Sequence, residues 1–324
     1  MGRLNWRGSM SRLLVQRAGL GLLTLVAISA LLFFGTNMLP GDVAAALLGQ
    51  QATPEALHNI REALGLNQPA WWRYLRWLSG VLHGDFGVSL ASGRSVAGAL
   101  MPRLGNTLVL ALLAGVISVP LAVGLGVASA MREGGIFDRL TSILSLMSIS
   151  VPEFFIGYVL VVVFAANLGW LPSLAMINPG MSLGERLAAI TLPVMTLVLV
   201  VLAHMLRMTR SSLLSVMSAP YIEMAFLKGL NRSTVVLRHA LPNAAAPIIA
   251  VIALNLGYLV VGVVVVEVVF VYPGAGQLMV DAVAKRDLPL VQACGLVFAA
   301  TYVGLNTIAD MVAILVNPRL KVPR

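Results

Sequence analysis

Charged residues and cysteine are both scarce in this chain. Only 11% of its 324 residues are charged and 59% are hydrophobic, whereas soluble domains contain about 25% charged residues. The mean hydropathy is +0.91. The one cysteine, Cys294, excludes a disulfide within the chain, and its apolar surroundings indicate a small buried hydrophobic residue. This composition excludes an ordinary soluble domain and predicts an integral membrane protein.

Motifs for nucleotide binding and for hydrolysis are also missing. The sequence contains no Gly-x-x-x-x-Gly-Lys-(Ser/Thr) loop, no His-Glu-x-x-His pair and no Gly-x-Ser-x-Gly turn. The histidines, His58, His83, His204 and His239, are dispersed, so their spacing gives no support to a metal site. We therefore expect no catalytic residues, no metal site and no cofactor in this chain.

The positive charge has a simpler explanation than nucleic-acid binding. The net charge is +9, but the basic residues are scattered between apolar runs and form no single patch. Basic residues concentrate in the short cytoplasmic loops of membrane proteins. We therefore expect no nucleic-acid partner, and the distribution places the loop between the fourth and fifth apolar runs in the cytoplasm.

Six apolar runs are long enough to cross a bilayer, which takes about 20 residues per helix. The first follows an Arg-led tail and is interpreted as an uncleaved span with its amino end in the cytoplasm. Six spans put both termini on that side. The sequence thus predicts an all-α polytopic membrane protein with spans at about 13–34, 107–129, 140–165, 187–206, 244–269 and 289–316.

Three regions follow from this pattern. Residues 1–35 form a cytoplasmic tail and the first span, residues 36–103 an extracytoplasmic region with interfacial helices, and residues 104–324 the core transmembrane domain. In the second region, helices are predicted to begin near Pro54 and Pro69. The second carries an aromatic group that is typical of a membrane–water interface, although a substrate-binding cage is an alternative. Its members are Trp71, Trp72, Tyr74 and Trp77.

The longest polar interruption in the second half of the chain covers residues 221–243, within a cytoplasmic loop at 212–243. Glu223 lies on a helix-forming segment, Gly229 breaks it, and residues 233–234 can cap a second helix. Pro242 is expected to mark where that helix gives way to the next. The pattern predicts a helix–glycine–helix elbow between two spans, which suits docking into a groove of a partner.

The residue order in this elbow resembles the EAA loop of ABC-importer permeases. The matching positions are Glu223, Ala225, Gly229, Leu241 and Pro242. Met224 replaces the usual middle alanine, and His239 stands where many members carry an apolar residue; methionine is a good helix former. The segments at 64–69 and 84–89, together with 238–244, are similar to the dipeptide/oligopeptide/nickel branch.

The resemblance implies an ABC type I importer permease fold in the bacterial inner membrane. It implies a non-catalytic subunit that forms half of a pathway for di- and oligopeptides; nickel, metal chelates or glutathione are the other cargoes of the branch. Implied partners are a second homologous permease, two ATPase subunits or domains, an extracytoplasmic substrate-binding protein and the lipid bilayer. The implied ATPase-coupling residues are Glu223, Met224, Ala225, Lys228, Gly229, Arg232, Leu241 and Pro242.

Carboxylates in membrane spans are costly and therefore informative. Glu153 and Glu267 either line the pathway or pair with a neighbouring helix, whereas for Asp310 we expect the pair. The segment from Glu267 to Gly276 also resembles the outer segment after the fifth span of the family. The predicted pathway or gate residues are Glu153, Glu267, Phe270, Pro273 and Gly274.

Two other classes of membrane protein are alternatives to the importer. An ion-coupled secondary transporter would use Glu153, Glu267 or Asp310 as proton carriers and would need no ATPase. Inverted repeats would favour that class, and the sequence has no convincing internal repeat. An intramembrane enzyme would need paired catalytic residues, which the sequence does not contain.

Overall fold

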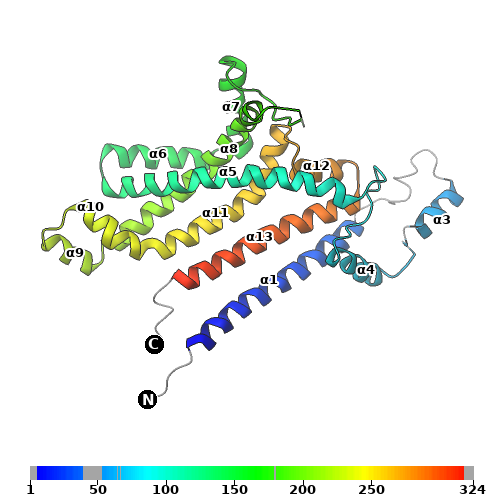
Figure 1. The fold of residues 1–324 in the computed structure, drawn as a ribbon, viewed down its shortest axis with the longest axis horizontal. Coiled ribbons are helices and arrows are strands. Elements are labelled where there is room, and N and C mark those ends of the chain that lie inside the picture. The colour runs from blue at the N-terminus through cyan, green and yellow to red at the C-terminus, as the bar shows by residue number, and fades with distance from the viewer. Residues whose placement is uncertain (1–5, 39–52, 64, 66, 179, 317–324) are drawn as a thin grey trace. The chain divides into compact units, whose positions relative to one another are not determined.

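The computed structural model describes residues 6–38, 53–63, 65, 67–178 and 180–316. Every regular element in this part of the chain is a helix, as predicted. Five helices are long and apolar enough to cross a membrane, and one bent pair raises the number to six if it is a single span. The all-α polytopic fold is therefore confirmed (Figure 1).

The second, fourth and fifth candidate spans are longer than the apolar runs alone indicate. Hydropathy marks only the lipid-facing part of a helix, and the helices continue into the polar segments on either side. The candidate spans are α1 (Trp6–Asn37), α5 (Val96–Met131), α8 (Leu183–Met217), α10 (Arg232–Thr234) running through a π-helical turn into α11 (Leu241–Val269), and α13 (Leu288–Val316). The shorter helices are α3 (Pro54–Ala63), α4 (Ala70–Leu82), α9 (Pro220–Leu227) and α12 (Ala275–Ala284).

The third predicted span, at about 140–165, is not one straight helix. The chain instead forms α6 (Ile136–Ser150) and α7 (Glu153–Leu160), which continues as a π-helical turn to Asn167, with a bend of 106° between the two. Val151 and Pro152 are extended, with ψ of 130° and 145°. Proline lacks an amide hydrogen and disfavours helical geometry in the residue before it. Glu153 therefore begins a helix instead of lying in the middle of one.

The loop before the third span is also shorter than predicted. α6 begins at Ile136, so Asp138 and Arg139 belong to its first turns and only residues 132–135 separate it from α5. A negative residue in the first turn of a helix is stabilised by the helix dipole. The predicted span bounds leave both residues in the loop, because charge alone does not reveal where a helix begins.

The chain divides into two compact units, which are described separately. The first unit contains residues up to Gly21, Val109–Tyr272 and the residues from Tyr302 on. In this unit α8 packs against α11, α6 and α7 (Figure 1). Its buried face includes Leu192, Leu197, Val201 and Met205. α8 is therefore the central helix of this unit.

Gly126 of α5 allows α5 to approach α8 closely. A Cβ atom added there would lie 2.8 Å from Cβ of Thr209 and 3.0 Å from the carbonyl oxygen of Leu206. We expect Gly126→Leu to lower the stability of the purified chain, measured as its melting temperature in detergent, because overpacking costs about 1–3 kcal/mol. Gly124→Leu is the control, because nothing lies within 4 Å of a Cβ at that position. Equal melting temperatures for the two variants would contradict the close approach.

The second unit contains Leu22–Leu108 and Pro273–Thr301. Its core brings together the start of α5, the short helix α12 and the start of α13, and α12 was not predicted. Cys294 is fully buried there, as expected from its apolar neighbours. Asp287 is also buried and accepts hydrogen bonds from the hydroxyl of Ser89 and from the amide of Leu90, at 3.1 Å for the amide. This carboxylate fixes the loop before α5.

The aromatic group of α4 has two different roles within this unit. Tyr74 and Trp77 stack on Phe33 of α1, each with ring centroids 5.6 Å apart, and the Tyr74 hydroxyl lies 2.8 Å from that of Ser29. Trp71 and Trp72 remain exposed. The anchor interpretation therefore suits the two exposed tryptophans, whereas Tyr74 and Trp77 hold α4 against α1.

Candidate functional site

The predicted elbow is present between α8 and α11. α9 begins with Pro220 at its first position and ends at Leu227, with Lys228 as its C-cap, after which Gly229 turns the chain with a φ of +80°. Only glycine adopts this left-handed conformation without a steric penalty. The next helix is capped by Asn231, whose side-chain oxygen accepts from the amide of Thr234 at 2.8 Å. The predicted cap at residues 233–234 is therefore wrong by two positions.

Pro242 does not separate two helices, which corrects the prediction. The chain is helical without a break from Arg232 to Val269, and Pro242 lies in the first turn of α11. Val235–Ala240, directly before it, forms a π-helical turn. A proline removes one helical hydrogen bond and clashes with the preceding turn, and the wider π-helical turn accommodates both effects. The second helix of the elbow thus runs directly into the fifth span.

Burial divides the predicted coupling residues into two groups. Ala225 is buried with Ile222 in a cluster that also contains Leu213, Val235 and Val236, and Leu241 packs against that cluster. These residues hold the elbow on the bundle. The exposed coupling residues are Glu223, Met224, Lys228, Gly229, Arg232 and Pro242.

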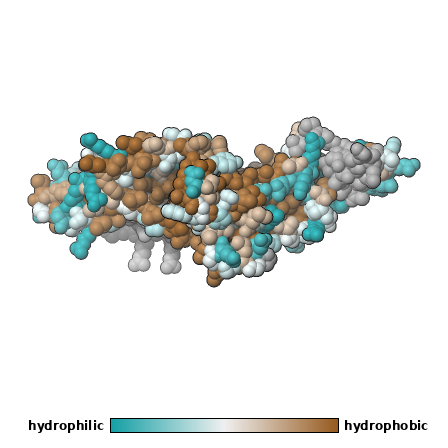
Figure 2. Space-filling model, turned by 90° about the horizontal axis from the view of Figure 1, so that it is seen from above, coloured by the Kyte–Doolittle hydropathy of each residue, from teal (hydrophilic) through white to brown (hydrophobic). Residues whose placement is uncertain are grey.

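The exposed face of the elbow is also apolar. Met224 is 54% exposed and Leu227 74% exposed, and Tyr221, Phe226 and Leu230 are exposed beside them. Hydrophilic side chains gather at the end of the unit that carries α9 and α10, while hydrophobic side chains cover the adjoining helices (Figure 2). An apolar patch rimmed by polar residues is typical of a protein–protein interaction site.

Arg232 connects the elbow to the turn between α5 and α6. Its Nη2 atom donates to the carbonyl oxygen of Ala130 at 3.3 Å and lies 3.5 Å from Oε2 of Glu133. The predicted contact of Arg232 with an ATPase stays a prediction, and the structure gives this residue an additional contact within the chain. A movement of the elbow would therefore reach the end of α5.

Asp138, directly behind this turn, is a buried junction that sequence reasoning missed. Its carboxylate accepts hydrogen bonds from the hydroxyl of Ser129, from the amide of Gly134 at 3.0 Å and from Nη2 of Arg210 at 2.8 Å. The side chain of Asp138 is 5% exposed and that of Arg210 27% exposed. The ion pair joins α6 to α8. The hydrogen bond from the Ser129 hydroxyl connects Asp138 to α5, and the hydrogen bond from the Gly134 amide connects it to the turn between α5 and α6.

Glu153 lines a cavity inside the first unit. The cavity has a volume of about 330 Å³ and is bounded by the bend between α6 and α7, by Val200 and His204 of α8, and by Tyr258 of α11. A second cavity of about 490 Å³ shares His204 and Tyr258 and extends along α11 past Asn255. Sequence reasoning predicted Glu153 but not His204 or Tyr258, since single residues on separate helices carry no signal of their proximity.

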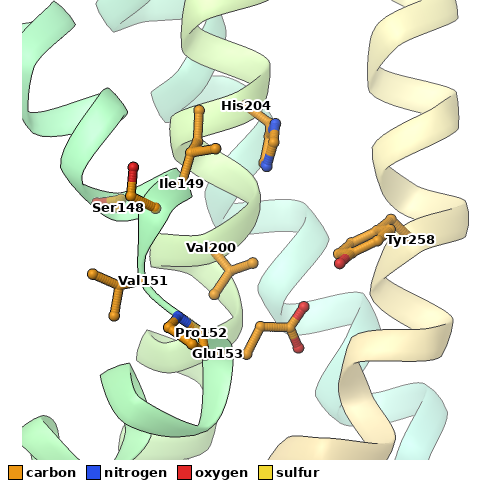
Figure 3. Close-up of a pocket in the computed structure, with 9 residues that line it drawn as sticks. Ser148, Ile149, Val151, Pro152, Glu153, Val200, His204 and Tyr258 are labelled. Atoms are coloured by element: carbon orange, nitrogen blue, oxygen red, sulfur yellow. The ribbon is translucent and has the colours of Figure 1, made fainter.

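The polar groups of the first cavity face one another. Figure 3 shows the Glu153 carboxylate and the Tyr258 hydroxyl pointing into the same space, with His204 farther along α8. Oε2 of Glu153 is buried and has no hydrogen-bond partner among the described residues. A Cβ atom at Gly262 would lie 2.9 Å from this oxygen, so the carboxylate occupies the space that glycine leaves.

The predicted gate residues lie in both units. In the first unit Glu267 and Phe270 are fully buried beside Tyr272, and the main-chain oxygen of Phe270 accepts from Ala175 at 2.8 Å. Burial, reinforced by the charge of Glu267, raises the pKa of Tyr272 to about 12. Glu267 and Phe270 therefore belong to a packed segment at the end of the fifth span.

The remaining gate residues belong to the second unit. The carbonyl oxygen of Pro273 accepts from Asn106 at 2.8 Å, and Gly274 is the N-cap of α12. Both residues thus fix the start of α12. Asp310, in the first unit, pairs with Nη1 of Arg17 at 2.8 Å, so this carboxylate has the kind of ion-pair partner that was expected of it. The described residues contain no group of three His, Cys, Asp or Glu side chains that could hold a metal ion.

Comparison with known proteins covers almost the whole chain. Residues 122–322 match the family described as binding-protein-dependent transport system inner membrane component, and residues 10–111 match the N-terminal domain of such membrane components. The probable peptide ABC transporter permease protein y4tP of Sinorhizobium fredii is 38% identical over 290 residues, which are 90% of this chain and 93% of the relative. The glutathione transport system permease protein GsiC of Escherichia coli K12 is 36% identical over 303 residues, 93% of this chain and 96% of the relative. The chain therefore belongs to the binding-protein-dependent transport system inner membrane components, the multi-pass permeases of ABC importers.

Proposed function

We propose that this chain forms half of the pathway of an ATP-driven importer for di- and oligopeptides, and that its elbow couples the pathway to ATPase subunits. The observation that carries the coupling role is the structure of the elbow. One of its faces is apolar and exposed, and its other face is buried in a hydrophobic cluster of the first unit. The substrate class is supported by the relatives, one named for peptides and one for glutathione, which is itself a small peptide.

The exposed face of α9 suits a groove in a cytoplasmic partner. Met224 and Leu227 supply apolar area, and Glu223 and Lys228 supply polar contacts at its rim. Protein–protein interfaces concentrate their binding energy in a few residues that become fully buried on binding. The basic residues of the surrounding loops support a cytoplasmic position for this end of the chain and for both termini.

Rigid contacts provide a route for the movement of an ATPase. The second helix of the elbow is continuous with α11, and through Arg232 it also contacts the turn that leads to Asp138 and α8. α8 and α11 both line the cavity that holds Glu153. A displacement of the elbow would therefore shift the two helices that border the cavity. ATP hydrolysis takes place on the separate ATPase chains.

Affinity purification from the native membrane in mild detergent tests this proposal. We expect a second permease and one or two ATPases to co-purify, and we expect the complex in proteoliposomes to take up a labelled dipeptide when ATP and the substrate-binding protein are supplied. A chain that purifies without any ATPase would overturn the proposal. That result would favour an ion-coupled transporter and direct attention to Glu153 and Glu267.

Glutathione is the second candidate cargo, because the 36% identical relative carries that name. Competition in the same uptake assay distinguishes the two. Inhibition of dipeptide uptake by glutathione at equal concentration would favour the glutathione assignment, and inhibition by nickel or metal chelates would favour the remaining branch of the family.

A further inference from the structure

We infer that the cavity between the α6–α7 bend, α8 and α11 binds the amino-terminal ammonium group of the peptide in transit, with Glu153 as its counter-ion. This inference rests on the proposed function, because it assigns a recognition site to the pathway of a peptide importer. It goes beyond the family assignment, which identifies no residue that contacts the cargo.

Glu153 has the properties of a carboxylate that lacks its cation. Its Oε2 atom is buried without a hydrogen-bond partner, and leaving a buried charged oxygen unsatisfied is costly. No Lys or Arg of the described residues lines this cavity or the adjoining one. The carboxylates of the other two candidate positions differ, because Asp310 has Arg17 as its partner and Glu267 is packed in the core. An external cation would therefore complete the site at Glu153.

The surrounding groups match an ammonium ion better than a metal ion. An ammonium group donates three hydrogen bonds, and a carboxylate, a phenol oxygen and a neutral imidazole nitrogen can each accept one. Glu153, Tyr258 and His204 place one acceptor of each kind in the lining of this cavity, with Glu153 and Tyr258 facing each other. A metal site would need several carboxylate, imidazole or thiolate ligands, and no group of three such residues exists in the described part of the chain.

The size and lining of the cavities suit a short peptide. Their volumes of about 330 and 490 Å³ meet at His204 and Tyr258, and pockets for small ligands span about 300–1,000 Å³. The first cavity also has apolar walls at Val151 and Val200, and the second at Met208 and Leu254. Apolar walls accept side chains of varied sequence, so a contact with the constant amino terminus would hold different peptides in one position.

Gly262 provides a second way to disturb the same carboxylate without changing its charge. Because a Cβ at this position would lie 2.9 Å from Oε2 of Glu153, Gly262→Ala must displace the carboxylate. Gly304→Ala is the matched control, since it adds the same methyl group in the same unit with nothing within 4 Å of it. The pair of variants separates displacement of Glu153 from the general effect of replacing a helical glycine.

The test measures equilibrium binding of a radiolabelled dipeptide and of its N-acetylated form to the assembled importer in nanodiscs, without the substrate-binding protein. We expect the wild-type complex to bind the free-amine dipeptide at least about tenfold more tightly than the acetylated form, which lacks the charge. Glu153→Gln should reduce this ratio to about one. Gly262→Ala should reduce it partly, and Gly304→Ala should leave it unchanged.

Three results would overturn the inference. The first is an affinity ratio between the free-amine and acetylated dipeptides that does not change in Glu153→Gln. The second is an equal loss of binding of both dipeptides in that variant, which would indicate a structural role for Glu153. The third is the absence of dipeptide binding by the wild-type complex up to the solubility limit of the dipeptide. The proposed function is judged separately, by ATP-driven uptake of the same dipeptide into proteoliposomes. If uptake occurs but the binding ratio does not depend on Glu153, only the ammonium site is wrong; if the wild type takes up no peptide, the proposed cargo itself is wrong.

Discussion

Gly229→Trp is expected to abolish ATP-driven uptake while the chain still inserts into the membrane. Gly229 has a φ of +80°, and this conformation costs other residues about 1–2 kcal/mol. None of the described residues lies within 4 Å of a Cβ atom added at Gly229, so the first atom of the new side chain meets no neighbour there. The indole projects from the turn of the elbow, next to the apolar face of α9, where we propose that the ATPase docks.

A conservative substitution separates backbone strain from obstruction of the docking face. Asparagine tolerates the left-handed conformation better than other non-glycine residues and has a small polar side chain. We therefore expect Gly229→Asn to retain most of the uptake. The measurements are uptake in proteoliposomes, the amount of chain in the membrane fraction and the amount of ATPase that co-purifies. Normal uptake together with normal ATPase association in Gly229→Trp would refute the docking assignment.

The membrane spans could be predicted well because lipid leaves the backbone few alternatives. Within the bilayer each amide and carbonyl must pair inside its own helix, so even the β-branched run 260–266 lies within α11. Gly229 was predictable for a similar local reason, since a glycine between two helix-forming segments is a common helix terminator. In both cases the information lies within a few neighbouring residues.

The broken third span was not predictable from its proline. Pro120, Pro193 and Pro247 lie within continuous helices, whereas Pro152 stands at a bend of 106°. The local sequence therefore does not decide whether a proline is accommodated or breaks the helix. Packing of the neighbouring elements decides it: α7, which begins after the bend, packs against both α8 and α11.

The contacts between distant residues could not be predicted for a different reason. Glu153, His204 and Tyr258 each stand alone in the sequence, and only the packing of α7, α8 and α11 brings them to one cavity. Arg232 illustrates the same limit, because its motif suggests a contact with a partner but not its contact with Glu133. Spacing within a helix predicts neighbours on that helix, but it does not predict which helices meet.

Asp138→Ala is expected to cost about 3–5 kcal/mol of stability, because it leaves a largely buried guanidinium without its partner. Asp138 accepts hydrogen bonds from Ser129, Gly134 and Arg210. Its replacement by alanine therefore leaves all three donors without their acceptor at the junction of α5, α6 and α8. The effect should appear as a lower melting temperature of the purified complex in detergent. Size-exclusion chromatography of heated samples measures how much folded complex remains at each temperature.

Glu133→Ala is the control, because it removes a carboxylate from the same corner of the chain. The pair of Glu133 with Arg232 is 3.5 Å long and about half exposed, and exposed pairs contribute about 0–1 kcal/mol. A melting temperature lowered equally by both substitutions would contradict the distinction between the buried and the exposed pair. No change in Asp138→Ala would show that the ion pair does not hold the junction.

A double replacement separates the structural role of the ion pair from its role in coupling. Exchanging a buried ion pair for well-packed apolar residues often restores stability, so Asp138→Leu combined with Arg210→Met should recover much of the melting temperature lost in Asp138→Ala. Uptake should remain low, because the apolar pair cannot replace the hydrogen bond to the amide of Gly134, which links α6 to the turn that Arg232 contacts. Recovery of uptake together with stability would mean that the elbow acts on the pathway through α11 alone.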